Sequence, residues 1–180
     1  RLQPILERNP HFLGLMKECA AVPYFSVDAP KGLPRTEIWN HYHYKNDVQS
    51  KFHTDTFQPT FKCWIYIEDI SLVQGPLHVI SGTQGLSKNR LEWDFENSTM
   101  SKTDALWKHR IEAGGKPGSF RAMESATAEE EMKEIERLAF GELITCEGIK
   151  NTFVAANTYN LHKRGIAPPG QQRNSVSVQY

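Results

Sequence analysis

Short segments with the composition of β-strands recur towards both ends of this 180-residue chain, and their spacing limits the folds that it can adopt. They are rich in β-branched and aromatic residues and are separated by glycine and proline. The segments cover 36–45, 61–69, 76–81, 141–148, 151–159 and 173–180. Because they do not alternate with helical segments, they predict an antiparallel sandwich or jelly roll rather than repeated βαβ units.

Helical patterns occupy the N-terminus and the middle of the chain. Within residues 1–20, apolar side chains recur at the spacing of one helix face, at Phe12, Leu15, Met16 and Cys19. The segment 85–140 has the pattern of an inserted pair of helices. The first of them is expected to begin at Ser101 and to stop at Gly114 and Gly115.

The second helix of this insertion has the clearer signals. Thr127 and Glu130 have the spacing of a capping box, and Glu129 and Lys133 have the spacing of an ion pair along a helix. Gly141 is expected to end the helix. One apolar stripe is expected to pack on the rest of the protein and consists of Met132, Ile135, Leu138 and Ala139.

Charge and size exclude several classes of protein. Lysine plus arginine and aspartate plus glutamate both number 21, so no charge excess favours nucleic acid or an anionic membrane surface. No apolar run reaches the roughly 18 residues of a membrane span. The length fits a single domain over 1–180, expected as a monomer or homodimer. The chain begins at Arg1 and not at methionine, which suggests that a preceding segment was removed.

The cysteines indicate the compartment. Cys19, Cys63 and Cys146 lie far apart and show no CxxC spacing, so neither a disulfide framework nor a zinc knuckle is predicted. A reducing compartment, the cytoplasm, is therefore expected.

The stretch KFHTDTF at 51–57 carries the pattern most typical of a metal site. Alternate side chains of a strand share a face, so His53 and Asp55, with Cα atoms about 7 Å apart, could bind one ion together. The 2-His-1-carboxylate triad of non-haem iron enzymes needs one more histidine. The candidate is His162, which directly follows a strand-like segment.

An arginine near the C-terminus supplies a second functional signal. Alternation along the final strand segment puts a polar set on one face, made of Arg173, Ser175, Ser177 and Gln179. A buried guanidinium needs an anionic partner, because leaving it unpaired is very costly. A bound dicarboxylate could provide that partner through two parallel hydrogen bonds.

Three segments together resemble the phytanoyl-CoA dioxygenase family of Fe(II)/2-oxoglutarate-dependent oxygenases. They are FHTDTF (52–57), CWIYIEDISLVQGPLHVISGTQ (63–84) and LHKRGIAPPGQQRNS (161–175). The resemblance implies a mainly β fold, the double-stranded β-helix or jelly roll of cupin-like proteins, with flanking and inserted α-helices. The insertion at 85–140 is then expected to cover the pocket as a lid.

The resemblance also implies a role for each matched residue. His53, Asp55 and His162 would hold Fe(II), and Arg173 would pair with the far carboxylate of 2-oxoglutarate. Such enzymes use dioxygen to hydroxylate an unactivated C–H bond of a small-molecule metabolite, and they release succinate and carbon dioxide. Related halogenases carry a small residue in place of the carboxylate ligand, so Asp55 disfavours halogenation and leaves hydroxylation or desaturation.

Other residues are candidates for the walls of the 2-oxoglutarate pocket. Asn40 or Tyr42, on one side of the segment WNHYHYK, could hydrogen-bond the cofactor, although packing in an aromatic core is as good an explanation. Trp64 is either a cofactor wall or plain core, and Ser175 shares the expected face of Arg173. Lys62 could attract an anionic substrate, but a solvated surface lysine is the favoured interpretation. The substrate itself stays open, with a small polar metabolite preferred.

Departures from the family and alternative functions also follow from the sequence. SGTQ (81–84) replaces the PGSH of the family, and Arg164 stands where a small hydroxyl residue is common. His78 is expected to be an ordinary strand histidine. One alternative is a cupin-type metalloprotein without 2-oxoglutarate that uses His41 and His43, and another is a catalytically silent binding module on the same fold.

Overall fold

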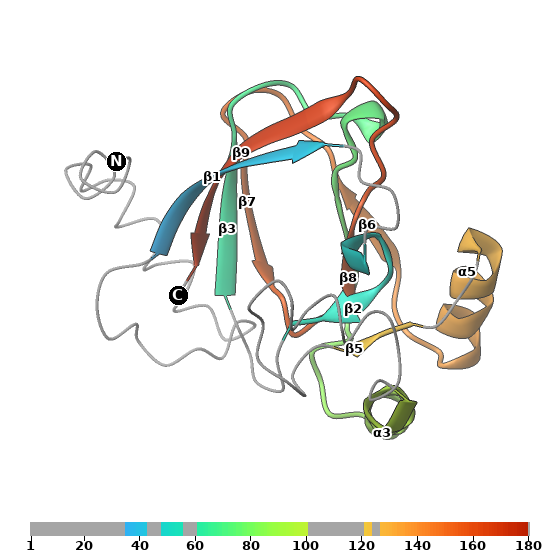
Figure 1. The fold of residues 1–180 in the computed structure, drawn as a ribbon. Helices are drawn as coiled ribbons and strands as arrows, with labels where there is room; N and C mark the ends of the chain where they lie inside the picture. The colour runs from blue at the N-terminus through green and yellow to red at the C-terminus, as the bar shows by residue number, and fades with distance from the viewer. Residues whose placement is uncertain (1–34, 43–47, 56–60, 101–120, 124–126, 180) are drawn as a thin grey trace.

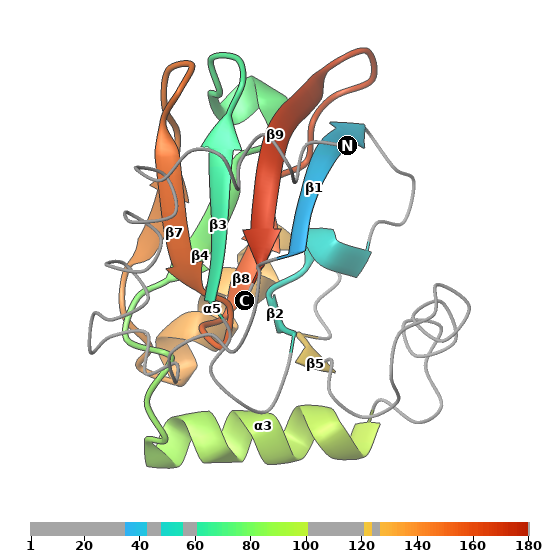
Figure 2. The same cartoon turned by 90° about the vertical axis from the view of Figure 1, so that its left-hand side faces the viewer.

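The computed structural model describes residues 35–42, 48–55, 61–100, 121–123 and 127–179. Within these ranges the chain is mostly β, with two antiparallel sheets that face each other as two layers (Figure 1). Figure 2 shows the four-stranded sheet face-on. Its strand order is β1 (Arg35–Tyr42), β9 (Gln172–Gln179), β3 (Phe61–Tyr66) and β7 (Phe153–Asn157).

The second sheet has five strands, and three of them are very short. Its order is β5 (Arg121–Ala122), β2 (His53–Thr54), β8 (His162–Arg164), β4 (Leu77–Ile80) and β6 (Leu143–Cys146). Every pairing in the two sheets is antiparallel. Odd-numbered strands other than β5 belong to the first sheet and even-numbered strands to the second, so most connections cross from one layer to the other.

All six strand segments expected from composition contain a strand, namely β1, β3, β4, β6, β7 and β9. The expectation of a mainly β, antiparallel fold is therefore confirmed for the described residues. The additional strands β2, β5 and β8 have only two or three residues, which is too short for alternation to identify.

Helix α5 (Ala128–Arg137) confirms the predicted capping box. The Thr127 hydroxyl accepts a hydrogen bond from the Glu130 N–H at 3.2 Å, and the Glu130 carboxylate accepts from the Thr127 N–H at 3.0 Å. Glu129 and Lys133 form the predicted ion pair at 2.7 Å, on the exposed side of the helix. The helix ends at Arg137, with Leu138 as its C-cap and before the expected stop at Gly141, and Ala139 takes a positive φ of 49°.

The apolar stripe predicted for α5 is only half right. Ile135 and Leu138 are buried, but Met132 and Ala139 are exposed, and the third buried position of the helix is Glu131. The carboxylate of Glu131 is accommodated by polar partners on the neighbouring sheet, which residue hydrophobicity cannot reveal.

Helix α3 (Lys88–Met100) was not predicted. Apolar residues do not mark the buried face of this helix, because Arg90 and Trp93 are fully buried whereas Leu91 and Phe95 are exposed. The helices expected within 1–20 and from Ser101 to Gly115 lie outside the described residues. Two single-turn 3-10 helices, η1 (Val48–Ser50) and η2 (Leu72–Gln74), complete the described elements.

Both helices lie beside the five-stranded sheet, with α5 on its outer side (Figure 1). The main apolar cluster joins these helices to the sheet and consists of Phe52, Ile80, Trp93, Met123, Ile135, Leu138 and Leu161. A smaller cluster between the two sheets contains Leu77, Val79 and Ala156, with Trp64, Cys146 and Val154 packed against it. Residues 52 and 161 therefore pack outwards, so residues 53 and 162 face the space between the sheets.

No helix within the described ranges combines the length and apolarity that crossing a membrane requires.

Candidate metal centre and cavity

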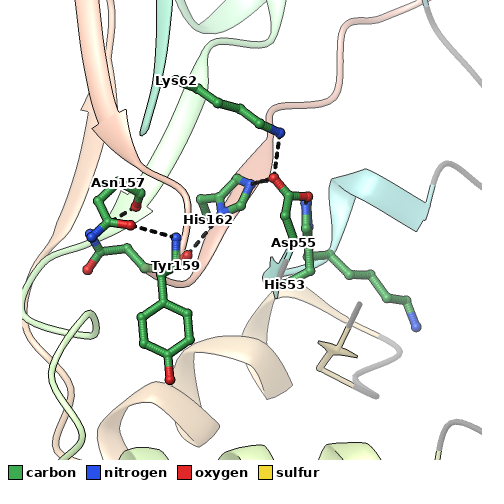
Figure 3. Close-up of polar contacts among 8 residues, drawn as sticks. His53, Asp55, Lys62, Asn157, Tyr159 and His162 are labelled. Carbon is green, nitrogen blue, oxygen red and sulfur yellow. Dashed lines mark hydrogen bonds and ion pairs between the residues drawn. The ribbon is translucent and has the colours of Figure 1, made fainter. Parts of the chain in front are cut away.

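Two histidines meet on the inner face of the five-stranded sheet. His53 of β2 and His162 of β8 are direct register partners. Their ring centroids lie 4.4 Å apart, and the rings are tilted by 53° (Figure 3). Antiparallel pairing thus brings together two imidazoles that are 109 positions apart in the sequence (162 minus 53).

Asp55 closes the group from the end of β2. Its Oδ1 lies 3.9 Å from Nε2 of His53, and its Oδ2 lies 3.6 Å from Nε2 of His162. Potential ligand atoms of the three residues all lie within 4.8 Å of one another, and all three residues are buried. Within the described part of the chain, this is the one group of three such side chains with the spacing of a metal site.

Backbone carbonyls orient both rings. Nδ1 of His53 lies 2.7 Å from the Lys51 carbonyl oxygen, and Nδ1 of His162 lies 2.9 Å from the Asn160 carbonyl oxygen. A carbonyl can only accept, so each Nδ1 carries the proton and each Nε2 keeps a lone pair. Both lone pairs face the carboxylate of Asp55. This arrangement of outer hydrogen bonds is typical of metal-binding histidines.

A tight turn fixes the carbonyl that holds His162. The Asn157 side-chain oxygen accepts a hydrogen bond from the Tyr159 N–H at 2.9 Å (Figure 3). The N–H of Asn160 donates to the Asn157 carbonyl at 3.1 Å, and so does its side-chain amide. An asparagine side chain that bonds the backbone two residues on forms an Asx-turn, which explains why this connection favours Asn.

Burial keeps both histidines neutral. Loss of solvation is the largest effect on each ring: together with the neighbouring His162 it lowers the pKa of His53 to about 3. Burial also lowers the pKa of His162, although the adjacent Asp55 carboxylate opposes the change. At neutral pH both rings therefore hold an unprotonated Nε2.

Asp55 stays ionised despite its burial. Burial alone would raise the pKa of Asp55, but His162, Lys62 and His53 together hold the pKa well below its usual value. Lys62 comes from β3 on the opposite sheet, and its ammonium donates to Oδ2 of Asp55 at 2.6 Å (Figure 3). The expectation of a solvated surface lysine is wrong, because the Lys62 side chain is 17% exposed and is paired with the carboxylate.

The three residues line one end of a cavity between the two sheets. The five-stranded sheet contributes Leu77 and Arg164 besides this group, and the opposite sheet contributes five residues of β3 and β9. The lining is Gln49, His53, Asp55, Lys62, Trp64, Tyr66, Leu77, His162, Arg164, Arg173 and Ser177. Lys62, Trp64 and Tyr66 alternate along β3 and so share its inner face. Trp64 lines the cavity and also packs against the inner core cluster, and its role as a wall for the cofactor stays a prediction.

Arg173 reaches this cavity from β9. It is 5% exposed, and its Nη1 donates to the Gly75 carbonyl at 2.8 Å. Gly75 has φ +67°, and a Cβ added to it would lie 2.3 Å from the Gly165 carbonyl oxygen. The N–H of Gly165 donates to the Pro76 carbonyl at 2.8 Å. Only glycine allows this close crossing, which fixes the carbonyl that orients Arg173.

The other residues predicted for the 2-oxoglutarate pocket are Ser175, Asn40 and Tyr42. Ser175 is fully buried between Arg173 and Ser177 on β9, and its hydroxyl has no hydrogen-bond partner among the described residues. The backbone of Asn40 is in register with Asn174, and that of Tyr42 with Gln172; Arg173 is paired with His41. The side chains of Asn40 and Tyr42 lie outside the described residues, as do those of His41 and His43, so their suggested roles stay predictions.

His78 behaves as an ordinary strand histidine. It lies on β4, and its Nδ1 is 3.0 Å from the Thr145 hydroxyl. It does not line the cavity. Burial lowers its pKa, with further lowering by Lys163 and Arg173.

Helices α3 and α5 belong to the segment 85–140 that is expected to form a lid. No residue of α3 or α5 lines the cavity, because both helices pack against the outer face of the five-stranded sheet. The lid expected for 85–140 stays a prediction, because residues 101–120 of that segment lie outside the described ranges.

Comparison with known proteins gives only distant matches. No protein-family model matches the sequence, and no curated protein matches it either. Similar solved structures are AviO1 from Streptomyces viridochromogenes Tue57 (11% identity, TM-score 0.42), EvdMO1 (13%, 0.49) and SnoN (14%, 0.45). SnoN is an epimerase solved in complex with Fe3+, alpha ketoglutarate and nogalamycin RO.

These matches cover most of this chain but a smaller part of the known proteins. They include 82%, 92% and 82% of this chain and 50%, 30% and 48% of AviO1, EvdMO1 and SnoN respectively. The chain thus spans half or less of the length of each. Likenesses at this level do not assign the chain to a family.

Proposed function

We propose that the chain is an Fe(II)- and 2-oxoglutarate-dependent oxygenase that hydroxylates an unactivated C–H bond of a small-molecule metabolite. The observation that carries the proposal is the convergence of the buried side chains of His53, Asp55 and His162 at one cavity that Arg173 also lines. Two neutral imidazoles and one carboxylate are the donor set of the facial triad of non-haem Fe(II) enzymes.

The donor set fits a divalent metal in charge as well as in type. His53 and His162 need to lose no proton at neutral pH, and Asp55 is already ionised. Metal ligands must be deprotonated, so a site prepared in this way binds a cation without proton release. The carbonyl contacts of both Nδ1 atoms fix the ring orientations in advance.

The opposite wall of the cavity fits a dicarboxylate. Arg173 offers a planar, permanently charged guanidinium, which recognises a carboxylate through two hydrogen bonds. Ser177, on the same strand, adds a hydroxyl to the lining. Trp64 and Leu77 supply apolar walls. A ligand that chelates the metal at one end and presents a carboxylate at the other would satisfy both sides, and 2-oxoglutarate has that form.

The strand order supports a double-stranded β-helix. Its two sheets would contain β1-β9-β3-β7 and β2-β8-β4-β6, with β5 added at one edge. Consecutive strands switch between facing sheets, as they do in a jelly roll built from two Greek keys. We extend the proposal to a single domain over 1–180.

Bound Fe(II) and 2-oxoglutarate would supply the activation of dioxygen and the oxidising power for C–H cleavage. The residues of the chain bind and orient these groups. His53, Asp55 and His162 would hold the metal, Arg173 would fix the far carboxylate, and the buried walls would exclude water from the reacting atoms. Asp55 would occupy the ligand position that a halide takes in related halogenases, which favours hydroxylation or desaturation over halogenation.

The decisive experiment is an anaerobic titration of the protein with Fe(II) and then with 2-oxoglutarate. A metal-to-ligand charge-transfer band should appear when both are present and should be absent in His53→Ala. His78→Ala is the matched control, because it removes a histidine from the same sheet outside the cavity, and it should keep the band. The proposal fails if wild type gives no band.

A catalytically silent binding module is the second candidate, and the Lys62–Asp55 ion pair favours it. An ammonium 2.6 Å from Oδ2 gives Asp55 a cation without any metal. Such a module would bind no Fe(II) in the titration, whereas the oxygenase would exchange the ammonium for the metal.

A further inference from the structure

One buried carboxylate on α5 is not used by the proposed function. Glu131 is 5% exposed and lies on the helix face that packs against the five-stranded sheet. Its Oε1 accepts a hydrogen bond from the Phe52 N–H at 3.2 Å, and its Oε2 accepts from the Lys163 ammonium. That ammonium also lies 4.4 Å from the centre of the Phe52 ring. Glu131 therefore connects two different strands.

Both contacts are adjacent to proposed metal ligands. Phe52 directly precedes His53 on β2, and Lys163 directly follows His162 on β8. The neighbours of the two histidines point to the outer face of the sheet, where Glu131 joins them. The histidines themselves point to the inner face, where they meet Asp55.

The pairing of β2 with β8 needs such support. It contains a single register pair, His53 with His162, because the two strands have only two and three residues. On its other side β2 pairs with β5, and the Met123 N–H donates to the Phe52 carbonyl at 2.8 Å. The N–H of Phe52 is held by Glu131, so both backbone polar groups of this residue are fixed.

A carboxylate at this position is costly for stability. Residues 131, 135 and 138 form one buried stripe of α5, and the other two are Ile and Leu. Replacing a buried ion pair by apolar residues of similar volume is often neutral or stabilising. An apolar residue here would complete the stripe but would leave the Phe52 N–H without its acceptor, so the choice of Glu131 indicates a role beyond packing.

We propose that Glu131 is a positioning residue for the metal centre, which acts by holding β2 and β8 in the register that places the two imidazoles side by side. The inference rests on the proposed function, since it requires a metal at His53, Asp55 and His162. It links helix α5 to the geometry of the site through Phe52 and Lys163.

The first test measures Co(II) affinity and the Co(II) d–d spectrum of Glu131→Gln. Affinity should fall about tenfold, in line with losses on removing outer hydrogen bonds of a metal site, and the d–d bands should shift as the ligand geometry loosens. The matched control is Glu129→Gln on the same helix, which removes the same charge from an exposed pair. Its affinity should stay within about twofold of wild type.

The second test separates positioning from stability. In Glu131→Met/Lys163→Met, the pair is removed without a change in net charge, and the apo protein should melt within a few degrees of wild type, because removal of the buried pair offsets the loss of the acceptor for the Phe52 N–H. Co(II) affinity should nevertheless fall about tenfold. Far-ultraviolet circular dichroism checks that Glu131→Gln folds. If it does not, the double variant is used in its place.

The outcomes separate this inference from the proposed function. If wild type does not bind Co(II), the metal centre is absent and both ideas fail. If wild type binds Co(II) and His53→Ala does not, while the folded Glu131 variants bind as tightly as wild type with an unchanged spectrum, the metal centre stands and the positioning role of Glu131 is overturned.

Discussion

The two sheets contribute different chemistry to one cavity. The five-stranded sheet supplies His53, Asp55 and His162, which are donors for a cation. The four-stranded sheet supplies Lys62 and Arg173, which are cations themselves. Arg164 of β8 is the described exception, since it adds a basic side chain from the five-stranded side.

The two sides also differ in how the backbone holds their side chains. The donors lie on strands of two and three residues, and turns and side-chain contacts fix them. Lys62 and Arg173 lie on strands of six and eight residues with long ladders on both sides. Metal binding should therefore respond to changes outside the cavity, whereas the anion side should respond mainly to changes of its own side chains.

The largest expected effect comes from the donors. His162→Ala should weaken Co(II) binding by about 100-fold or more, because each ligand of a protein metal site contributes on the order of 3 kcal/mol. Isothermal titration calorimetry of the apo protein measures it, with His78→Ala as control. Unchanged affinity in His162→Ala would break the assignment of the five-stranded sheet as the metal side.

Replacement of Arg173 should give the next largest effect. This effect is expected on the binding of 2-oxoglutarate and not on the binding of the metal. Arg173→Ala should weaken 2-oxoglutarate binding to the Fe(II)-loaded protein by about 30-fold or more, as expected when a buried charged partner is removed. Its Co(II) affinity should change by only a few fold. The charge-transfer titration reports the first quantity and calorimetry the second. The exposed Arg137 offers the control Arg137→Ala, which should change neither.

Replacement of Lys62 should change Co(II) affinity in the opposite direction from replacement of a metal donor. A metal that binds Asp55 must displace the Lys62 ammonium, so Lys62→Met should tighten Co(II) binding by about tenfold. The apo protein should become less stable, because a buried carboxylate loses its partner. Calorimetry and thermal melting of the same samples test both signs. Weaker Co(II) binding in Lys62→Met would show that Lys62 supports metal binding and does not compete with the metal for Asp55.

A last prediction concerns the pH dependence of apo stability. The pKa of His53 is lowered to about 3 in the folded protein, from about 6.5 when unfolded, and the pKa of His162 is lowered as well. Below pH 6.5 the unfolded chain therefore binds protons that the folded chain does not. Stability should fall with decreasing pH, by up to about 1.4 kcal/mol per pH unit for each histidine.

Urea unfolding between pH 4.5 and 7.5 measures this slope. The window lies above the unfolded pKa of Asp55, whose depressed folded pKa adds a loss of the same sign only at lower pH. His53→Gln should reduce the slope. A wild-type stability that is flat between pH 4.5 and 6.5 would show that the histidines on the metal side are not held neutral by burial.

Much of the fold was predictable from local patterns. Six strands were found from composition, and α5 was found from Thr127 and Glu130, because these signals lie within a few residues of one another. Helix α3 was missed, since a buried Arg90 and an exposed Phe95 remove its apolar period. The short strands β2, β5 and β8 exist through their neighbours and have no local signal.

The site was predictable only in part. The spacing of His53 and Asp55 is visible in the sequence, but the meeting with His162 depends on strand pairing, and the only local sign of His162 is its place directly after a strand-like segment. Lys62 was assigned to the surface, and Glu131 was not considered at all. Charged residues carry no sequence mark of burial, because their partners, Asp55 and Lys163, lie elsewhere in the chain or on another element.

The pairing of residues 53 and 162 also has a consequence for biosynthesis. During translation the first imidazole and the carboxylate emerge more than a hundred residues before the second imidazole, and contacts this distant in sequence form slowly. A nascent or truncated chain that ends before β8 would hold an incomplete donor set with little hold on a metal ion. Iron loading should therefore be a late event, coupled to the arrival of the last two strands.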